Sequence, residues 1–354
     1  MPDLTGLTLE PFRGDYEGLE KMAHSSWRDE YGISSFPNFY RPAFLHYLFG
    51  RIQDKDHLIA AYRGGEIVSF LGNIPHVFHF RGRVYRGTWS CLLVTRKELL
   101  RQGHALAIIN EALRINRKYK YDFALATFET GHRSNLMLRK LQAQGNRLEW
   151  MKRLRVIARI IDLRRVETSE GLKLWEKAAV KLVGGDQKPK RAGNEAVREY
   201  RPEDVKACLD LFNAYRDEIE LARIWEEAEL AWELDCPGVA QTLIYEKDGG
   251  VAGAINFIYH DHLGKTKERW AWVNHVAYPG LTPAERFRFV QAFLGYIRSQ
   301  DCIGAIEWTK GYYPMGPFYR THFFPYFRSV NMYSWTFHPE ISLSNVRGCN
   351  EILV

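Results

Sequence analysis

The feature that most constrains the fold of this chain is an internal duplication. The segment PFRGDYEGLEKMAHSSWRDEYG near the N-terminus recurs as EYRPEDVKACLDLFNAYRDEIE in the second half. One offset of 188 residues relates Phe12 to Tyr200 (200 − 12) and Trp27 to Tyr215 (215 − 27). Each copy reads as a short strand followed by a helix with apolar residues at helical spacing. A period of half the chain indicates a tandem duplication and not a solenoid.

The rest of each copy keeps the same order of elements. Strands with alternating apolar residues come next, and the glycine pairs Gly64–Gly65 and Gly249–Gly250 mark a hairpin turn in each copy. A strand, a loop and an amphipathic helix follow, and then a buried strand, YDFALATFE or CIGAIEWTK, with a short helix after it. We therefore expect an α/β (α+β) chain of two tandem domains, each a mixed, mostly antiparallel sheet flanked by helices.

The two copies set the expected domain boundaries. We predict an N-terminal domain over residues 1–165, a linker helix and loop over 166–196, a C-terminal domain over 197–340 and a tail over 341–354. The strand RVIARIIDL closes the first copy, and the helix SEGLKLWEKAAVKL follows it. The glycine, proline and charge content of the segment that ends at Ala196 is typical of an exposed linker.

Composition argues against several classes of protein. The five cysteines are scattered without a CxxC pair, so neither a disulfide framework nor a zinc site is expected. No apolar run is long enough for a membrane span and no signal peptide is evident, so we expect a cytoplasmic protein. The net charge of +7 suits an anionic ligand such as a phosphorylated cofactor. Basic and acidic residues alternate, so nucleic acid is not an expected partner, and the oligomeric state stays open.

One segment of the first copy is a candidate anion site. Cys91 to Leu113 reads CLLVTRKELLRQGHALAIINEAL, which is an apolar strand, a basic turn with one glycine, and an amphipathic helix. A helix N-terminus gathers unpaired N–H groups and the positive end of the helix dipole, and it therefore binds phosphate readily. The alternative is a turn that needs the glycine for its backbone alone.

This segment resembles the acyl-CoA signature of the GNAT N-acyltransferase family, Arg/Gln-x-x-Gly-x-Gly/Ala, and the order of elements is similar to that of the GNAT fold. In that family the loop amides hold the pyrophosphate of CoA, and the preceding strand hydrogen-bonds the pantetheine. Gly103 and Ala105 match the signature, whereas Leu100 replaces its first Arg or Gln. The cofactor contacts that the resemblance implies are Leu92, Leu93, Val94, Arg101, Gln102, Gly103, His104 and Ala105.

Two further segments bear on this resemblance. In GHRSNLMLRKLQAQG, Ser134 or Asn135 takes the place of the family's Asn near the cofactor, and Leu141 takes the place of the Tyr that protonates the leaving thiolate. The second copy keeps that tyrosine as Tyr319. Its loop has lost the signature, because Glu285 falls near the glycine, where a carboxylate would repel a pyrophosphate. We therefore expect the first half alone to bind CoA.

The resemblance implies an acyltransferase that moves an acetyl or other acyl group from CoA to an amine by direct attack on the thioester. The reaction needs amide donors for the carbonyl oxygen, which Leu92 to Val94 would supply, and a base for the amine. Glu129 is a candidate base; the alternative is a carboxylate that caps the next helix. The many aromatic residues also allow a long-chain acyl or aminoacyl donor. Loss of the family's Arg and Tyr would also fit a CoA-binding or interaction protein without activity.

Several other residues have a structural interpretation beside a functional one. The HDH triplet, His260 to His262, is predicted to be a solvated turn, so no metal site is expected. His275 is expected to be a satisfied strand histidine, and Cys91 a small core residue. His104 is either a phosphate contact or an exposed residue at a helix start.

The tail ends in the apolar residues Ile352, Leu353 and Val354, although chain termini are usually polar and frayed. Tandem GNAT enzymes of similar layout, such as the N-myristoyltransferases, bring a C-terminal carboxylate into the active site as the base. The resemblance would give that role to the α-carboxylate of Val354. The alternative is an apolar tail that packs on the second domain.

Overall fold

A computed structural model describes residues 6–31, 35–131, 134–182, 184, 187, 189 and 195–350. The first half folds, in chain order, into β1 (Leu7–Pro11), α1 (Tyr16–Tyr31), β2 (Phe36–Pro37), α2 (Pro42–Phe49), the 3-10 helix η1 (Lys55–His57), β3 (Leu58–Arg63), β4 (Glu66–Phe80), β5 (Arg83–Thr95), η2 (Lys97–Leu99), α3 (His104–Lys118), β6 (Phe123–Glu129), α4 (Ser134–Ala143) and β7 (Leu148–Ile160).

The second half repeats this order after two connecting helices. Those helices are α5 (Leu163–Glu170) and α6 (Leu174–Leu182). The elements that follow are β8 (Val197–Glu199), η3 (Pro202–Asp204), α7 (Val205–Asn213), β9 (Leu221–Ile224), α8 (Glu227–Leu234), β10 (Ala240–Lys247), β11 (Gly250–Leu263), β12 (Lys267–Ala277), α9 (Pro283–Ser299), β13 (Gly304–Trp308), α10 (Gly316–Arg320) and β14 (Phe324–Thr336). The predicted duplication is thus confirmed element by element, and the predicted mixed α/β fold with it.

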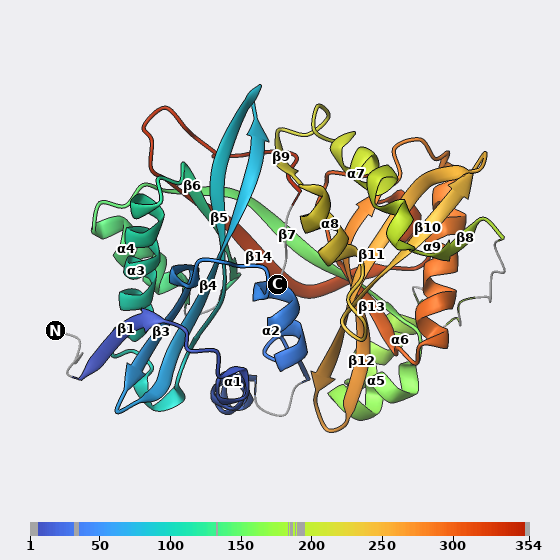
Figure 1. Cartoon of the computed structure of the whole chain (residues 1–354). Coiled ribbons are helices and arrows are strands. Elements are labelled where there is room, and N and C mark those ends of the chain that lie inside the picture. Colours follow the sequence, from blue (N-terminus) through green and yellow to red (C-terminus); the bar gives the residue numbers. More distant parts are fainter. Residues whose placement is uncertain are drawn as a thin grey trace.

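The strands of both halves form one continuous sheet (Figure 1). Its order is β1-β3-β4-β5-β6-β14-β7-β13-β12-β11-β10-β8, with β2 paired to β11 and β9 paired to β4. Neighbouring strands are antiparallel except for two parallel pairs, β5 with β6 and β12 with β13. The two parallel pairs occupy equivalent places in the two copies.

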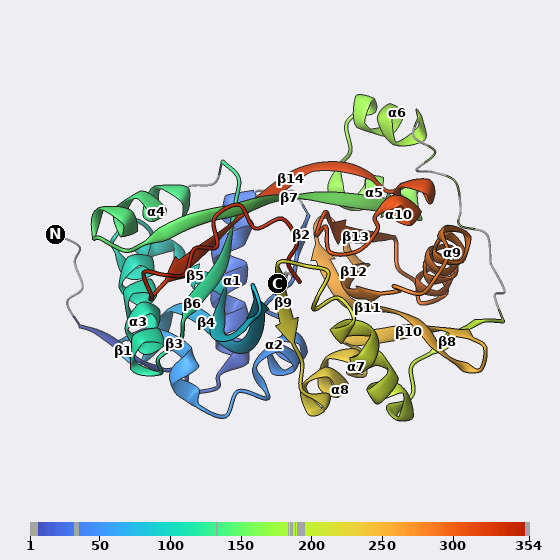
Figure 2. The same cartoon turned by 90° about the horizontal axis from the view of Figure 1, so that it is seen from above.

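The last strand of each half joins the halves together. β14 lies between β6 and β7, and β7 pairs in turn with β13 of the second half. Both strands run from one half to the other along one side of the molecule (Figure 2). The halves therefore cannot separate without loss of backbone hydrogen bonds. The boundaries at residues 165 and 197 stay a prediction.

Helices cover both faces of the sheet because the strands are apolar on both faces. In β3, for example, Leu58 and Ala60 pack with α1 and α2, whereas Ile59 and Ala61 pack with α3. Fully buried strands of this kind read as continuous apolar runs. The structure places α1 and α2 against one face of the first half, and α3 and α4 against the other.

Two local predictions are wrong. The HDH triplet is not a solvated turn: it belongs to β11, where His260 and His262 are buried among Phe39, Phe44 and Trp272. The long β11–β12 hairpin extends the strand through the triplet, because its register continues from Ala254↔Ala277 to Leu263↔Lys267. His104 is buried, so of its two interpretations the exposed residue at a helix start is wrong, and the phosphate contact stays a prediction.

Within the described ranges, no helix has the length and apolar character needed to cross a membrane. In the same part of the chain, no group of three or more His, Cys, Asp or Glu residues is arranged to hold a metal ion.

Candidate functional site

The two parallel strands of the first half separate partway along their length. β5 and β6 pair only over residues 87–90 and 123–126. Beyond that point residues 91–95 stay paired to β4 and residues 127–129 stay paired to β14, so a gap opens between them. A gap of this kind leaves backbone N–H and C=O groups for an extended ligand to bond as an added strand would.

A bulge in β5 turns the backbone at this gap. Phe70 pairs with Val94 but Gly72 pairs with Cys91, so two residues of β5 oppose one of β4. Leu92, within the bulge, has a φ of 53°, a left-handed conformation that costs a leucine on the order of 1 kcal/mol. Tyr40 Oη donates to the Leu92 carbonyl at 2.9 Å and holds the bulge. Bulges of this type re-aim backbone groups next to active sites.

A small apolar pocket of about 90 Å³ lies where the two strands diverge. Leu92 and Leu93 of β5, Ala126 to Phe128 of β6, and Ile109 and Leu113 of α3 contribute to its walls. Trp335 of β14 also lines it. The pocket is therefore placed to receive a short apolar group carried by a ligand in the gap.

The loop before α3 leaves the helix N-terminus open to a ligand. Arg101 has a φ of 67° and Gly103, the N-cap residue, has a φ of 93°. Among the described residues, no side chain caps the first turn of α3, so its N–H groups keep their hydrogen-bonding capacity. The Gln102 side chain instead donates to the Glu98 carbonyl at 2.9 Å and holds the loop. An uncapped N-terminus of a long helix beside left-handed backbone is an anion cradle.

An aromatic cavity of about 160 Å³ lies between the halves, at the C-terminal end of β6. Thr127 and Glu129 of β6 line one part of it. Its other walls come mainly from both halves' aromatic side chains, Trp27, Phe39, Trp270, Trp272, Trp308 and Tyr326. The cavity therefore lies at the end of β6, and Thr127 lines both it and the pocket at the strand gap.

Glu170, the last residue of α5, is a second carboxyl group in this cavity. Burial raises its pKa to about 7, although the Tyr326 hydroxyl, at 3.3 Å, and the charge of Arg328 oppose the rise. Near neutral pH the group therefore exchanges protons readily, and this is the property that a proton acceptor in an active site needs.

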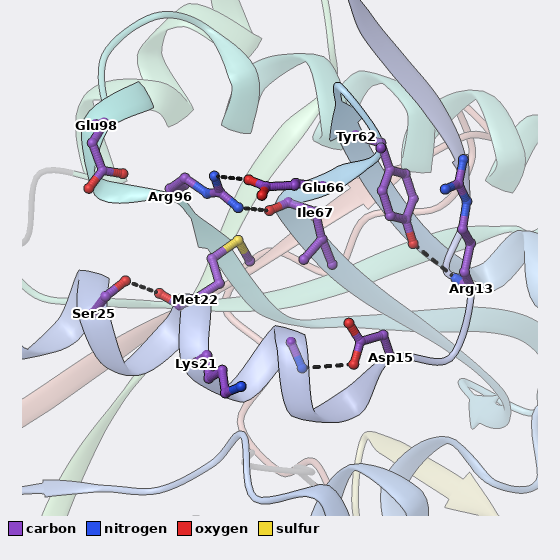
Figure 3. Close-up of a pocket in the computed structure, with 12 residues that line it drawn as sticks. Arg13, Asp15, Lys21, Met22, Ser25, Tyr62, Glu66, Ile67, Arg96 and Glu98 are labelled. Carbon is purple, nitrogen blue, oxygen red and sulfur yellow. Dashed lines mark hydrogen bonds and ion pairs between the residues drawn. The ribbon is translucent and has the colours of Figure 1, made fainter.

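A hollow of about 640 Å³ lies beside α1 and the β3–β4 hairpin (Figure 3). Arg96 enters it directly after β5, but its guanidinium is bound to Glu66 at 2.7 Å and to the Ile67 carbonyl at 2.9 Å. Arg13 lies across the Tyr62 ring. The hollow is open, and both arginines are already engaged with groups of the protein.

The architecture matches solved structures over the whole chain. N-myristoyltransferase from Saccharomyces cerevisiae, crystallised with bound myristoyl-CoA, superposes with a TM-score of 0.79 at 15% identity, over 100% of this chain and 86% of that one. Another crystal structure of the same enzyme with bound myristoyl-CoA superposes with a TM-score of 0.78 at 16% identity. The match covers 100% of this chain and 90% of that one. A GCN5-related N-acetyltransferase from Kribbella flavida superposes with a TM-score of 0.50 at 13% identity. The match covers 93% of this chain and 70% of that one.

The chain has a tandem GNAT fold. No family model and no curated protein sequence matches it. The likeness in fold therefore extends across both halves although fewer than one residue in five is shared.

The second GNAT unit closes the helix N-terminus that the first leaves open. In α9 the Thr282 hydroxyl accepts from the Glu285 backbone N–H, and the Glu285 carboxylate accepts from the Thr282 N–H at 2.7 Å. This capping box uses the donors that an anion would need and adds a negative charge. The arrangement supports the prediction that the second half does not bind CoA.

The second unit also fills its own strand gap. β12 and β13 pair only over residues 270–272 and 304–306. Beyond that point the buried Lys310 Nζ donates to the carbonyls of Val273 and Asn274 at 2.8 and 2.7 Å and lies 3.2 Å from Glu307. The Val276 N–H donates to Tyr312 Oη at 3.0 Å. In the second unit, a lysine side chain and a tyrosine hydroxyl thus occupy carbonyl and N–H groups beyond the parallel pairing of β12 and β13.

The structure brings together most of the predicted site residues. Leu92, Leu93 and Val94 lie at the strand gap, Arg101 to Ala105 form the loop and the first turn of α3, and Glu129 lies at the adjoining cavity. Ser134 and Asn135 begin α4, but their side chains lie outside the described part of the structure, as does all of Val354.

Neither of the two positions that the resemblance equates with the proton-donating tyrosine places a proton donor at the site. Tyr319 is 46% exposed on α10 of the second half and lines neither the gap nor the aromatic cavity. Leu141 is fully buried in the core beneath α3 and α4, so its position supplies packing and no proton.

Three functional features were missed from the sequence. Glu170 falls in the segment predicted as a linker, and no motif marks it. The hydrogen bond of Lys310 to the Val273 carbonyl and that of Tyr40 to the Leu92 carbonyl both join residues that are far apart in the chain. The adjacent pair Leu92-Leu93 in an apolar strand gives no sign of a bulge, because bulges depend on strand pairing.

Proposed function

We propose that the protein is an acyl-CoA-dependent N-acyltransferase. The observation that carries this proposal is the open strand gap with a bulge at Leu92, next to an uncapped helix N-terminus at Gly103. The fold shared with an N-myristoyltransferase crystallised with myristoyl-CoA supports an acyl-CoA donor. Acyl transfer from a thioester needs both an anion cradle and amide donors at the carbonyl, and this half supplies both.

The donor lies along the gap in this proposal. The amides of Arg101, Gln102, Gly103, His104 and Ala105 face the pyrophosphate, and Leu92 to Val94 bond the pantetheine and the thioester oxygen. The acyl group then enters the pocket where β5 and β6 diverge. Its volume of about 90 Å³ has room for a few methylene-sized groups, so acetyl or another short acyl group is the proposed cargo.

The acceptor is an amine in the aromatic cavity. Its apolar stem packs against Trp27, Trp272 and Trp308, and its nitrogen lies near Glu129 at the end of β6. The ammonium gives one proton to a carboxylate, the nitrogen bonds to the carbonyl carbon, and the C–S bond breaks. A second proton passes from nitrogen to the thiolate, which leaves an amide and free CoA.

Three carboxylates are candidates for the base. Glu129 lies at the end of β6 beside the strand gap, and burial raises the pKa of Glu170 to about 7. The α-carboxylate of Val354 is the third, because the described tail ends at the buried Asn350, whose N–H donates to the Leu221 carbonyl between the halves.

A thiol-release assay tests this function. Acetyl-CoA and a panel of primary amines should release free CoA, and Glu129→Gln should lower kcat about a hundredfold or more if it is the base. If the tail supplies the base, deletion of residues 351–354 should lower kcat in the same way. The control is CoA binding, which the deletion should leave intact. An intact protein that binds acetyl-CoA but transfers nothing to any amine would contradict the proposal.

One observation favours a second function, CoA binding without turnover. Buried Leu141 stands where the resemblance to GNAT enzymes would place a proton-donating tyrosine, and Tyr319 does not line the pocket at the gap. Tight CoA binding with no thiol release over background would select this alternative. A longer acyl chain would require the pocket walls at Leu113 and Trp335 to move.

A further inference from the structure

The second connecting helix, α6, shows an apolar face to solvent. Of its nine residues only Val180 is buried, in an apolar cluster that also includes Val166 of α5. Leu174 and Leu182 are 84% and 88% exposed, and Trp175 is 54% exposed. Elsewhere in the described chain, no helix or strand exposes more than one large apolar side chain in this way. An exposed group of this kind marks a surface that meets a partner.

The exposed apolar residues of α6 share one face of the helix. Five of them recur at helical spacing and form an apolar stripe, which consists of Leu174, Trp175, Ala178, Ala179 and Leu182. The same spacing places Val180 on the opposite face, where it anchors the helix to the body of the protein. Figure 2 shows α6 outside the strands β7 and β14. The stripe therefore points away from the core.

Lysines follow one border of this stripe. Lys173, Lys177 and Lys181 recur every four residues and so lie in one row along the helix. Lys177 is bound to Glu167 of α5, whereas Lys173 and Lys181 are exposed. The acidic residue of α6, Glu176, is only partly exposed, and its carboxylate accepts the Lys173 backbone N–H at 2.7 Å. The charge beside the stripe is therefore mainly positive.

The size and charge of this face distinguish between occupants. A stable protein interface takes about 20–30 residues from each partner, which is far more than one short helix offers. A bilayer surface sets no such requirement, because leucine and tryptophan enter the boundary below the headgroups while lysines contact anionic phosphates above it. Tryptophan is favoured at that boundary, since its ring is apolar and its N–H can stay hydrated. The net charge of +7 also attracts the whole chain to an anionic surface.

We propose that α6 docks the protein on a membrane surface that carries anionic lipid. Leu174, Trp175 and Leu182 enter the boundary between headgroups and acyl chains, and Lys173 and Lys181 contact the lipid phosphates. One short helix gives weak, reversible binding, so attachment depends on both the apolar stripe and the lysines. This proposal does not depend on the acyltransferase function.

Flotation of the full chain with lipid vesicles tests the proposal. The protein should bind vesicles of equal parts phosphatidylglycerol and phosphatidylcholine at least about tenfold more tightly than vesicles of phosphatidylcholine alone, because the lysines are attracted to anionic headgroups. High salt should remove this preference. No binding to the anionic vesicles, or equal binding to both kinds, would overturn the proposal.

One pair of variants tests the apolar stripe. Trp175→Gln combined with Leu182→Gln should weaken binding to the anionic vesicles at least about tenfold. The control is Val84→Gln combined with Leu136→Gln, which replaces two exposed apolar residues of the first half and should leave binding unchanged. Glutamine is a good helix former, and thermal unfolding shows that each variant is folded. Unchanged binding by the first variant would contradict the proposal.

A second pair of variants tests the lysines. Lys173→Gln combined with Lys181→Gln should remove most of the preference for anionic vesicles. Arg139→Gln combined with Lys140→Gln makes the same change in charge at exposed residues of α4 and should keep the preference. An equal loss in both variants would show attraction by net charge alone and would overturn the role of α6.

Fluorescence tests which face of the protein docks. Lipids brominated in their acyl chains should quench the bound protein, and the quenching should be lost in Trp175→Phe but kept in Trp150→Phe, which changes an exposed tryptophan of β7. Quenching that survives Trp175→Phe would place another face on the membrane. Sedimentation equilibrium without lipid tests a second copy as the occupant. A dimer that Trp175→Gln combined with Leu182→Gln dissociates would overturn the proposal.

Discussion

At the scale of single residues, the charges that surround a buried carboxyl group decide whether it can exchange a proton or stays ionised. Glu170 and Glu233 are both carboxyl groups at cavities between the halves. Burial raises the pKa of Glu170 to about 7, with only Tyr326 and Arg328 to oppose it. Burial also disfavours ionised Glu233, but Arg223 and His275 outweigh it and hold its pKa well below the usual range. The first group is therefore poised to exchange a proton, and the second is fixed as an ion.

Glu170→Gln should make the protein more stable at alkaline pH. The pKa of Glu170 is raised on folding, so its cost is absent below pH 4.5 and grows as pH rises to about 7. At pH 8 the gain is at most about 3 kcal/mol in the free energy of unfolding, and at pH 4 it vanishes. Urea unfolding at both pH values measures it. Glu167→Gln, one turn away in α5, is the control that should change little.

At the scale of elements, the two halves use the same strand–loop–helix unit in opposite ways. α3 begins without a side-chain cap, next to left-handed Arg101 and Gly103, whereas α9 begins with the Thr282–Glu285 capping box. One N-terminus is therefore open to an anion and the other is satisfied internally.

Gly103→Glu should abolish CoA binding, because the new side chain strains a φ of 93° and places a carboxylate at the cradle. Calorimetry with CoA measures this. Gly280→Glu in the equivalent loop of the second half is the matched control: no atom lies within 4 Å of the added Cβ, and affinity should not change. A folded Gly103→Glu protein with unchanged affinity would remove the loop from the site.

The sequence predicts the helices and strands well, but it predicts poorly which strands pair and which distant side chains meet. The offset between Phe12 and Tyr200 predicts the duplication, because each copy encodes its own helix and strand periodicity. The capping residues Thr282 and Glu285 lie only three residues apart, so the loss of the signature can also be read from the sequence. The hydrogen bond of Lys310 to β12 and the pairing of β14 with β6 both depend on how distant strands pair. Local periodicity in the sequence does not encode this pairing.

At the scale of the whole molecule, shared strands and a buried ionic cluster hold the two GNAT units together. Glu229 bonds Arg51 of the first half and Arg223 of the second, and β9 pairs with β4. A cluster of this kind adds little net stability over an apolar core, but it is costly to break in part.

Arg223→Met should destabilise the protein by about 3–5 kcal/mol, because it leaves Glu229 and Glu233 buried without their main counter-ion. The loss should shrink as the pH falls and the carboxylates of the variant become protonated. Urea unfolding at pH 7 and pH 5 tests both parts. The surface pair Arg81–Glu220 supplies the control, Arg81→Met, which should cost less than about 1 kcal/mol.

The central claim is that the first GNAT unit, and not the second, holds acyl-CoA. Native mass spectrometry of the full chain with acetyl-CoA tests it most directly, since it counts bound molecules. We predict one acetyl-CoA per chain, lost in Gly103→Glu and kept in Gly280→Glu. Two molecules per chain, none, or one that survives Gly103→Glu would contradict the account.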